Sequence, residues 1–139
     1  MTAPCILDAS AALAWAFRDE LDEPARALSF GLADGYAEVP SVWHLEVANG
    51  LWVAERRGRI TRDDALSFLA TLVELDIRSD ATAAERAFND ILDLAGRAQV
   101  AVYDAAYLDL ALRRQLPLAT RDEALAAAAR RLGIALIPA

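Results

Sequence analysis

The 139-residue sequence contains no lysine, one cysteine and one histidine. The absence of lysine excludes any chemistry that needs a side-chain amine, and all 14 basic residues are arginines. The single cysteine, Cys5, cannot form an internal disulfide, and its place in an apolar run predicts a buried strand residue rather than a nucleophile. The single histidine, His44, excludes mechanisms that require two histidines, and we expect it on a helix surface.

Long apolar runs are also missing. No stretch approaches the roughly 20 unbroken apolar residues of a membrane span, and the start of the chain has no basic region and reaches an acid at Asp8, which is too early for a signal peptide. We therefore expect a cytoplasmic protein with no membrane association. The length suits a single domain, residues 1–139, that buries a core unaided.

Positive charge is scarce, since 21 acidic residues against 14 arginines give a net charge of −7. An acidic total argues against broad phosphate binding through charge alone. If the substrate is a nucleic acid, something other than net charge must recruit it.

Short apolar segments alternate with stretches of helical composition, and this pattern predicts an α/β fold. We expect a three-layer sandwich with a central parallel sheet of about four to five short strands. Strands are predicted at residues 5–7, 36–39, 75–77, 118–120 and 135–137. Helices are predicted at residues 10–17, 25–33, 42–57, 82–95 (ended by Gly96) and 122–132. Two more are predicted to begin after the cap at residues 61–64 and within residues 102–108.

Three acids lie where such a sheet would gather them. Asp8 ends the first strand, Asp122 follows the fourth, and Glu46 lies one turn into the helix after residues 36–39. Because the carboxyl ends of parallel strands share one edge, we expect these side chains to meet there.

A fourth acid, Asp104, shares a helical face with Tyr107, Leu108 and Ala111, so it should point toward the protein. Asp109 lies about 140° around the same helix. We expect Asp109 to be solvated and paired with Arg113 at i,i+4. Asp109 then serves as a comparison for Asp104 on the same helix.

Each acid also has an ordinary structural explanation. Thr120 and Glu123 have the spacing of a capping box, within which Asp122 would only stabilise the start of a helix. Asp8 could cap the first helix. Glu46 and Asp104 could each be neutralised by an arginine from elsewhere in the chain.

Together, the four acids indicate a cation. Two carboxylates about 5 Å apart repel by roughly 3 kcal/mol at an effective dielectric near 20, and four acids form six such pairs. Carboxylates without cysteine or clustered histidine favour Mg²⁺ or Mn²⁺. Such an ion readily takes phosphate oxygens as further ligands, which points to metal-assisted phosphodiester hydrolysis.

Three neighbouring residues are candidates for supporting roles. Ser10 and Thr120 lie beside Asp8 and Asp122, where their hydroxyls could hold carboxylates or metal-bound waters, or could simply cap helices. Arg121 is the preferred phosphate contact.

Four motifs, taken together, resemble the PIN-domain ribonucleases, and specifically the VapC toxins of bacterial toxin–antitoxin pairs. They are Leu7–Ser10, Pro40–Asn49, Tyr103–Leu108 and Leu118–Leu125, and the resemblance extends over nearly the whole chain. It implies a PIN-like fold in which Asp8, Glu46, Asp104 and Asp122 bind Mg²⁺ or Mn²⁺ and activate a water that attacks an RNA phosphodiester. It also implies products with a 5′-phosphate and a free 3′-hydroxyl.

The same resemblance implies partners. VapC-like proteins form homodimers and bind a cognate VapB-type antitoxin, whose extended segment covers the groove and can place a basic side chain near the acids. Several apolar residues could supply surface for either partner, or could equally form plain core: Leu45, Leu51, Trp52, Phe68 and Leu72.

Other readings of the same acids are weaker or stay open. A phosphatase of the haloacid dehalogenase type needs a second aspartate two residues after the first, where this chain has Ser10, and it needs a lysine. A phosphoacceptor receiver domain also needs a lysine. A non-catalytic PIN-like module that binds RNA or protein stays open, and it would be favoured if the acids lay apart or were paired with arginines.

Overall fold

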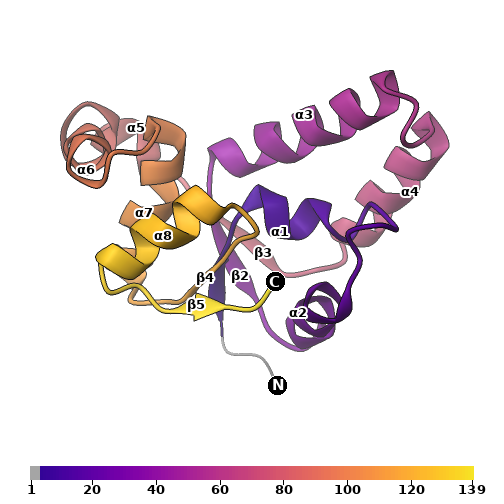
Figure 1. Cartoon of the computed structure of the whole chain (residues 1–139), viewed down its shortest axis with the longest axis horizontal. Coiled ribbons are helices and arrows are strands. Elements are labelled where there is room, and N and C mark those ends of the chain that lie inside the picture. Colours follow the sequence, from indigo (N-terminus) through magenta and orange to yellow (C-terminus); the bar gives the residue numbers. More distant parts are fainter. Residues whose placement is uncertain (1–3) are drawn as a thin grey trace.

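A five-stranded parallel sheet forms the centre of the computed structural model, which describes residues 4–139 (Figure 1). The strands are β1 (Cys5–Leu7), β2 (Ala37–Pro40), β3 (Ile77–Asp80), β4 (Leu118–Ala119) and β5 (Leu136–Ile137). Their order across the sheet is β3-β2-β1-β4-β5, and every neighbouring pair is parallel. The predicted α/β fold with a parallel sheet is confirmed, although β3 continues three residues beyond its predicted end.

The helices follow the strands as the alternating pattern predicts. They are α1 (Ala9–Leu13), α2 (Glu23–Ala33), α3 (Val42–Arg56), α4 (Arg62–Leu72), α5 (Ala83–Arg86), α6 (Leu92–Ala98), α7 (Val102–Arg114) and α8 (Glu123–Arg131). The predicted helix 82–95 is wrong in detail, because a π-helical turn at Ala87–Ile91 separates α5 from α6. Gly96 lies inside α6, which ends at Gln99 in the left-handed region with φ 58°.

The sheet topology separates the helices into two layers. The chain moves from β1 to β2 to β3 toward one edge, then returns to β4 and β5 on the other side of β1. Because parallel crossovers are right-handed, this reversal places α1–α4 on one face of the sheet and α5–α8 on the other. Figure 1 shows the indigo-to-magenta helices and the orange-to-yellow helices on opposite sides of the strands.

The core lies on both faces of β1 and β4, whose side chains are fully buried. Cys5 is part of this core, as predicted, and burial raises the pKa of its thiol to about 11, so that it stays protonated at neutral pH. His44 is exposed, also as predicted. Within residues 4–139, none of the helices combines the length and the apolar content that crossing a bilayer demands.

Apolar residues that could belong to an interface divide into two groups. Leu51 and Leu72 are buried in the core, so the plain explanation holds for them. Leu45 and Trp52 lie on α3 with 73% and 50% of their surface exposed.

Helices α1 and α3 pack closely at Gly50. A Cβ atom added there would overlap the side chain of Leu13 on α1. The missing side chain thus lets α3, which carries Glu46 one turn earlier, lie close to the helix that begins directly after Asp8.

Two buried acids, one on α7 and one at the end of β3, are paired with arginines, and we call this group the ion-pair network. Asp109 on α7 accepts from Arg86 at 2.8 and 2.9 Å and from Arg113 at 3.0 Å. Asp80 at the end of β3 accepts from Arg113 at 2.7 Å and from Arg114 at 3.3 Å. The expected pair between Asp109 and Arg113 is confirmed, but the expectation that Asp109 is solvated is wrong, because α5 brings Arg86 over it and leaves 5% exposed.

Candidate functional site

The candidate site lies where the topology of the sheet reverses. Strands β1 and β4 are neighbours, yet the helices that follow them, α1 and α8, cover opposite faces. A crevice opens at the carboxyl ends of two such strands, and ligands of α/β sheets bind there. Asp8 follows β1 directly, and its backbone N–H donates to the Ala119 carbonyl of β4 at 2.9 Å.

Asp8 is buried and held by two hydroxyl groups. Its Oδ2 atom accepts from Ser10 Oγ at 2.5 Å and from Thr120 Oγ1 at 2.7 Å. Each hydroxyl also accepts a backbone N–H, Ser10 from Arg121 at 2.9 Å and Thr120 from Asp122 at 3.0 Å. The Asp8 side chain makes no capping bond to α1, so its ordinary explanation as a helix cap fails.

Glu46 and Asp104 approach the same crevice from opposite layers. Both are half-buried, Glu46 on α3 and Asp104 in the first turn of α7. The Tyr107 hydroxyl donates to Glu46 Oε1 at 2.6 Å. Within residues 4–139, the Asp104 carboxylate has neither a hydrogen-bond donor nor an arginine in reach.

Besides burial, the charges of neighbouring acids contribute to the raised pKa values of three of these carboxyl groups, Asp8, Glu46 and Asp104. Burial raises the pKa of Asp8, and the charge of Asp122 raises it further. Burial also raises the pKa of Glu46 and of Asp104; the charge of Asp8 adds to both, Asp104 adds to Glu46, and Asp122 adds to Asp104. We call Asp8, Glu46, Asp104 and Asp122 the acidic cluster.

Asp122 has a second, structural role, as its ordinary explanation predicted. It is exposed, and its Oδ1 atom accepts the Leu125 N–H at 3.0 Å, so Asp122 itself is the N-cap of α8. The predicted capping box with Thr120 as cap is wrong, because the Thr120 hydroxyl is directed to Asp8 instead.

Arg121 does not direct its guanidinium to the acidic cluster. The group pairs with Asp22 at 3.0 Å and donates to the Ala139 carbonyl at 2.7 Å. In this arrangement the guanidinium would have to leave both partners to reach a phosphate, and the predicted phosphate contact of Arg121 stays a prediction. Its backbone N–H, by contrast, helps to fix Ser10.

The explanation that arginines neutralise the cluster fails as well. Among the ion pairs of residues 4–139, none includes Asp8, Glu46, Asp104 or Asp122. The repulsion within the cluster is therefore met by raised pKa values and hydroxyl donors rather than by a cation of the chain.

The donor set fits a hydrated hard cation. In the part of the chain that the structure describes, no three acidic, histidine or cysteine side chains stand close enough to enclose an ion by themselves. Mg²⁺ retains several waters and is usually held by one or two carboxylates, so the chemistry of these oxygen donors suits it even though they do not enclose it. The sequence pattern places Tyr107 only on an apolar face and does not predict its bond to Glu46; the one signal for that bond is that a buried tyrosine hydroxyl usually needs a polar partner.

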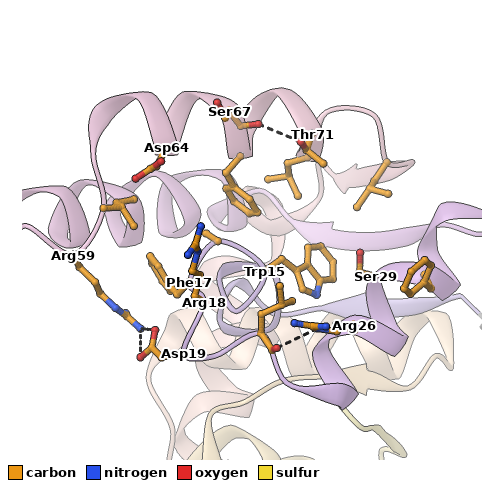
Figure 2. A pocket seen from close by; sticks show the side chains of 17 residues that line it. Trp15, Phe17, Arg18, Asp19, Arg26, Ser29, Arg59, Asp64, Ser67 and Thr71 are labelled. Carbon is orange, nitrogen blue, oxygen red and sulfur yellow. Dashed lines mark hydrogen bonds and ion pairs between the residues drawn. The ribbon is translucent and has the colours of Figure 1, made fainter.

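A groove of about 770 Å³ lies elsewhere and contains no member of the acidic cluster (Figure 2). It lies between α4 on one side and α2 with the α1–α2 connection on the other. Trp15, Phe17 and Phe68 line it, and an ion pair between Arg59 and Asp19 lies at its edge. Size alone therefore does not mark the place where the acids gather.

Comparison with known proteins establishes the family. The family model described as PIN domain matches residues 5–131. The chain belongs to the PIN-domain family. This PIN domain is 38% identical over 81 residues to Ribonuclease VapC3 of Pyrobaculum aerophilum, an alignment that covers 58% of the chain and 62% of that protein. The resemblance predicted from the four motifs is thereby confirmed.

A solved structure agrees with this assignment. The crystal structure of PAE2754 from Pyrobaculum aerophilum superimposes with a TM-score of 0.67 at 25% identity, and the match covers 92% of the PIN domain and 79% of the other chain. The likeness thus extends over the sheet and both helical layers.

Proposed function

We propose that this PIN domain is a Mg²⁺- or Mn²⁺-dependent ribonuclease and the toxin of a toxin–antitoxin pair. The observation that carries the proposal is the acidic cluster: four acids at the crevice of the sheet, each interacting with the charge of at least one other and none with an arginine partner in residues 4–139. Similarity to a protein named Ribonuclease VapC3 supports the choice of RNA as substrate.

The residues would divide the work as follows. Asp8 and Asp104 would hold the ion, and Glu46 and Asp122 would act from either side, directly or through its waters. Ser10 and Thr120 occupy Oδ2 of Asp8, which leaves Oδ1 for the ion. When bound, Mg²⁺ or Mn²⁺ would supply a nucleophilic water and neutralise charge on the scissile phosphate.

The acidic character of the site also bears on its partners. A bound divalent ion would reduce the local repulsion of RNA and would take a phosphate oxygen as a further ligand, so that net charge need not recruit the RNA. We propose a VapB-type antitoxin as partner, because a guanidinium or ammonium inserted among the unpaired carboxylates would replace the cation. The exposed Leu45 and Trp52 on α3 offer apolar surface for the antitoxin or for a homodimer. A cytoplasmic location follows as part of the same proposal.

The alternative, a non-catalytic PIN-like module that binds RNA or protein, is disfavoured by the same observation. Acids kept for binding or stability alone would be paired, as Asp80 and Asp109 are. Unpaired acids in a crevice cost stability, and such an arrangement is typical of sites that need it for chemistry.

RNA cleavage by the purified chain tests the proposal. We expect cutting with Mg²⁺ or Mn²⁺, no cutting with chelator, and a loss of at least 100-fold in Asp104→Asn, because the ion loses a charged ligand. Asp63→Asn is the matched control, since Asp63 is an exposed acid on α4 outside the cluster. Undiminished cleavage by Asp104→Asn, or in the presence of chelator, would remove the mechanism.

The ends of the products give an independent check. When water attacks the phosphorus and the 3′-oxygen leaves, the products carry a 5′-phosphate and a 3′-hydroxyl, and the step does not need the ribose 2′-hydroxyl. We therefore expect a substrate with a single 2′-deoxynucleotide at the cleavage position to be cut normally. Cyclic 2′,3′-phosphate products would show that the RNA attacks itself and that the acidic cluster has another role.

A further inference from the structure

We propose that Tyr107 is a positioning residue that holds the Glu46 carboxylate at the acidic cluster. The inference rests on the proposed function, since the place of Glu46 matters only if the cluster binds an ion. Its basis is the bond from the Tyr107 hydroxyl to Glu46 Oε1 at 2.6 Å, the one hydrogen bond of that carboxylate within residues 4–139.

The bond joins the two helical layers across the crevice. Glu46 comes from α3, on the face covered by α1–α4, and Tyr107 comes from α7, on the other face. Tyr107 lies three residues after Asp104, so one turn of α7 supplies both an acid of the cluster and the donor that fixes a second acid. A single helix thereby sets the relative placement of Asp104 and Glu46.

Tyr107 is suited to this task because burial restricts the rotation of its side chain. Its side chain is fully buried, among the largest side chains in the core. The hydroxyl reaches Glu46 from a ring that is packed on all sides, and such a donor is pre-organised. Glu46, by contrast, is half-buried and has a long, flexible side chain.

Glu46 needs such a restraint because its neighbours repel it. The charges of Asp8 and Asp104 both act on it, and rotation toward solvent would relieve the repulsion whenever no ion is bound. A hydrogen bond to an ionised acceptor is among the stronger kinds. Without the hydroxyl we expect the carboxylate to swing outward, so that ion binding has to draw it back at the cost of affinity.

A purely structural role is the competing explanation, in which Glu46 merely satisfies a buried hydroxyl. The two roles differ in what the Tyr107→Phe variant changes. Phenylalanine keeps the ring and its packing and removes only the donor. If Tyr107 positions Glu46, affinity for the ion falls while the fold stays; if its role is structural, stability falls while affinity stays.

The experiment is calorimetric titration of the folded, metal-free chain with Mn²⁺. We expect Tyr107→Phe to bind Mn²⁺ about 10-fold more weakly than the wild type, the usual size of an effect on groups that orient ligands. The matched control is Tyr103→Phe on the same helix, where the side chain is 64% exposed, and we expect its affinity to be unchanged. Equal affinities in Tyr107→Phe and the wild type would overturn the inference.

A double-variant cycle removes the remaining ambiguity. In the Glu46→Ala background, Tyr107→Phe should weaken Mn²⁺ binding no further, because there is no carboxylate left to position. Glu46→Asp, which withdraws the carboxylate by one methylene from an intact Tyr107, provides a second variant and should weaken binding by itself. An equal loss from Tyr107→Phe with and without Glu46 would refute the positioning role.

The same titration separates this inference from the proposal on which it rests. If the wild-type chain binds no Mn²⁺, the metal-dependent function fails, and the inference fails with it. If the wild type binds Mn²⁺ and Tyr107→Phe binds it equally well, only the role of Tyr107 is wrong.

Discussion

The acidic cluster and the ion-pair network bury aspartates to the same depth but treat them in opposite ways. Asp8 is 6% exposed, and Asp80 and Asp109 are 6% and 5% exposed. The pKa of Asp8 is raised by burial, whereas hydrogen bonds from Arg113 and its neighbours overcome burial and lower the pKa of Asp80 and Asp109. Burial alone therefore does not decide the charge state of an acid; the cations placed beside it do.

Helix α7 contains one acid of each kind, Asp104 of the acidic cluster and Asp109 of the ion-pair network. Asp104 lies in its first turn on the crevice side, and Asp109 lies five residues later beneath Arg86 and Arg113. The two positions differ in the arginines available to them. The sequence provides many arginines, yet within residues 4–139 none pairs with the cluster, which leaves that place for a cation from outside the chain.

The largest expected effect comes from breaking the network. Arg113→Met removes the guanidinium shared by Asp80 and Asp109 and leaves two buried carboxylates short of a partner. We expect the free energy of unfolding to fall by about 3 kcal/mol, as measured by urea denaturation. Arg97→Met is the control, because Arg97 pairs with Asp93 on an exposed surface and its loss should change little. A similar small change in both variants would mean that the network is not a source of stability.

Adding Mn²⁺ should stabilise the acidic cluster, which has no arginine partner, and so test its difference from the ion-pair network. If Mn²⁺ binds the folded chain at the acidic cluster, a concentration 100 times its Kd should stabilise the wild type by about 2.7 kcal/mol. Asp104→Asn should gain much less, because the ion loses a charged ligand. Thermal unfolding with and without Mn²⁺ measures this difference, and an equal gain in both proteins would place the ion elsewhere.

Two equivalent substitutions on α7 should then act in opposite directions. Without metal, Asp109→Asn should lower the free energy of unfolding by about 2 kcal/mol, since it weakens charge-assisted bonds from two arginines. Asp104→Asn should leave stability unchanged or raise it, because it removes repulsion from Asp8 and Asp122. A clear loss of stability in Asp104→Asn would point to an undetected structural partner.

The smallest effect concerns the pH at which these differences disappear. The pKa of Asp104 in the folded chain lies above its ordinary value of 3.8, so the wild type begins to recover the lost stability as the pH falls through that raised pKa and has recovered it once the pH falls below 3.8. The pKa of Asp109 lies below 3.8, so its contribution is kept until the pH falls below 3.8. When the free energy of unfolding is plotted against pH, each Asn variant should therefore meet the wild type at a different pH. Asp104→Asn should meet it at the higher pH. The reverse order would contradict both assignments.

The sequence predicted most of the fold because its apolar segments are short, separate and bounded by turns. All five strands and their parallel direction could be anticipated from that alternation, whereas their order across the sheet was not predicted. The break between α5 and α6 could not, because a π-helical turn at Ala87–Ile91 depends on how the segment packs rather than on a helix-breaking residue. The prediction that Gly96 ends the helix was wrong, because this glycine lies inside α6, whose C-cap is Gln99.

For the candidate site, the sequence predicted which acids follow strands but not what lies beside each of them. That Asp8 would lie near Asp122 follows from the order of parallel strands. The position of Arg86 over Asp109 and of Asp22 beside Arg121 depends on contacts between segments 23 and 99 residues apart, and no local pattern encodes such contacts. The metal-binding roles of the four acids remain predictions.

Gly50 has no functional group, yet it affects how closely two helices beside the acidic cluster pack. Because α1 and α3 touch where this glycine leaves room for Leu13, the gap between the helices that carry or follow Asp8 and Glu46 is set by one missing methyl group. Widening it with Gly50→Ala, or restoring it by a paired Leu13→Ala, would tune the spacing of the acids from a distance without altering their chemistry. Protein engineers could thus change the spacing of charged side chains in a crevice by substituting only apolar residues outside it.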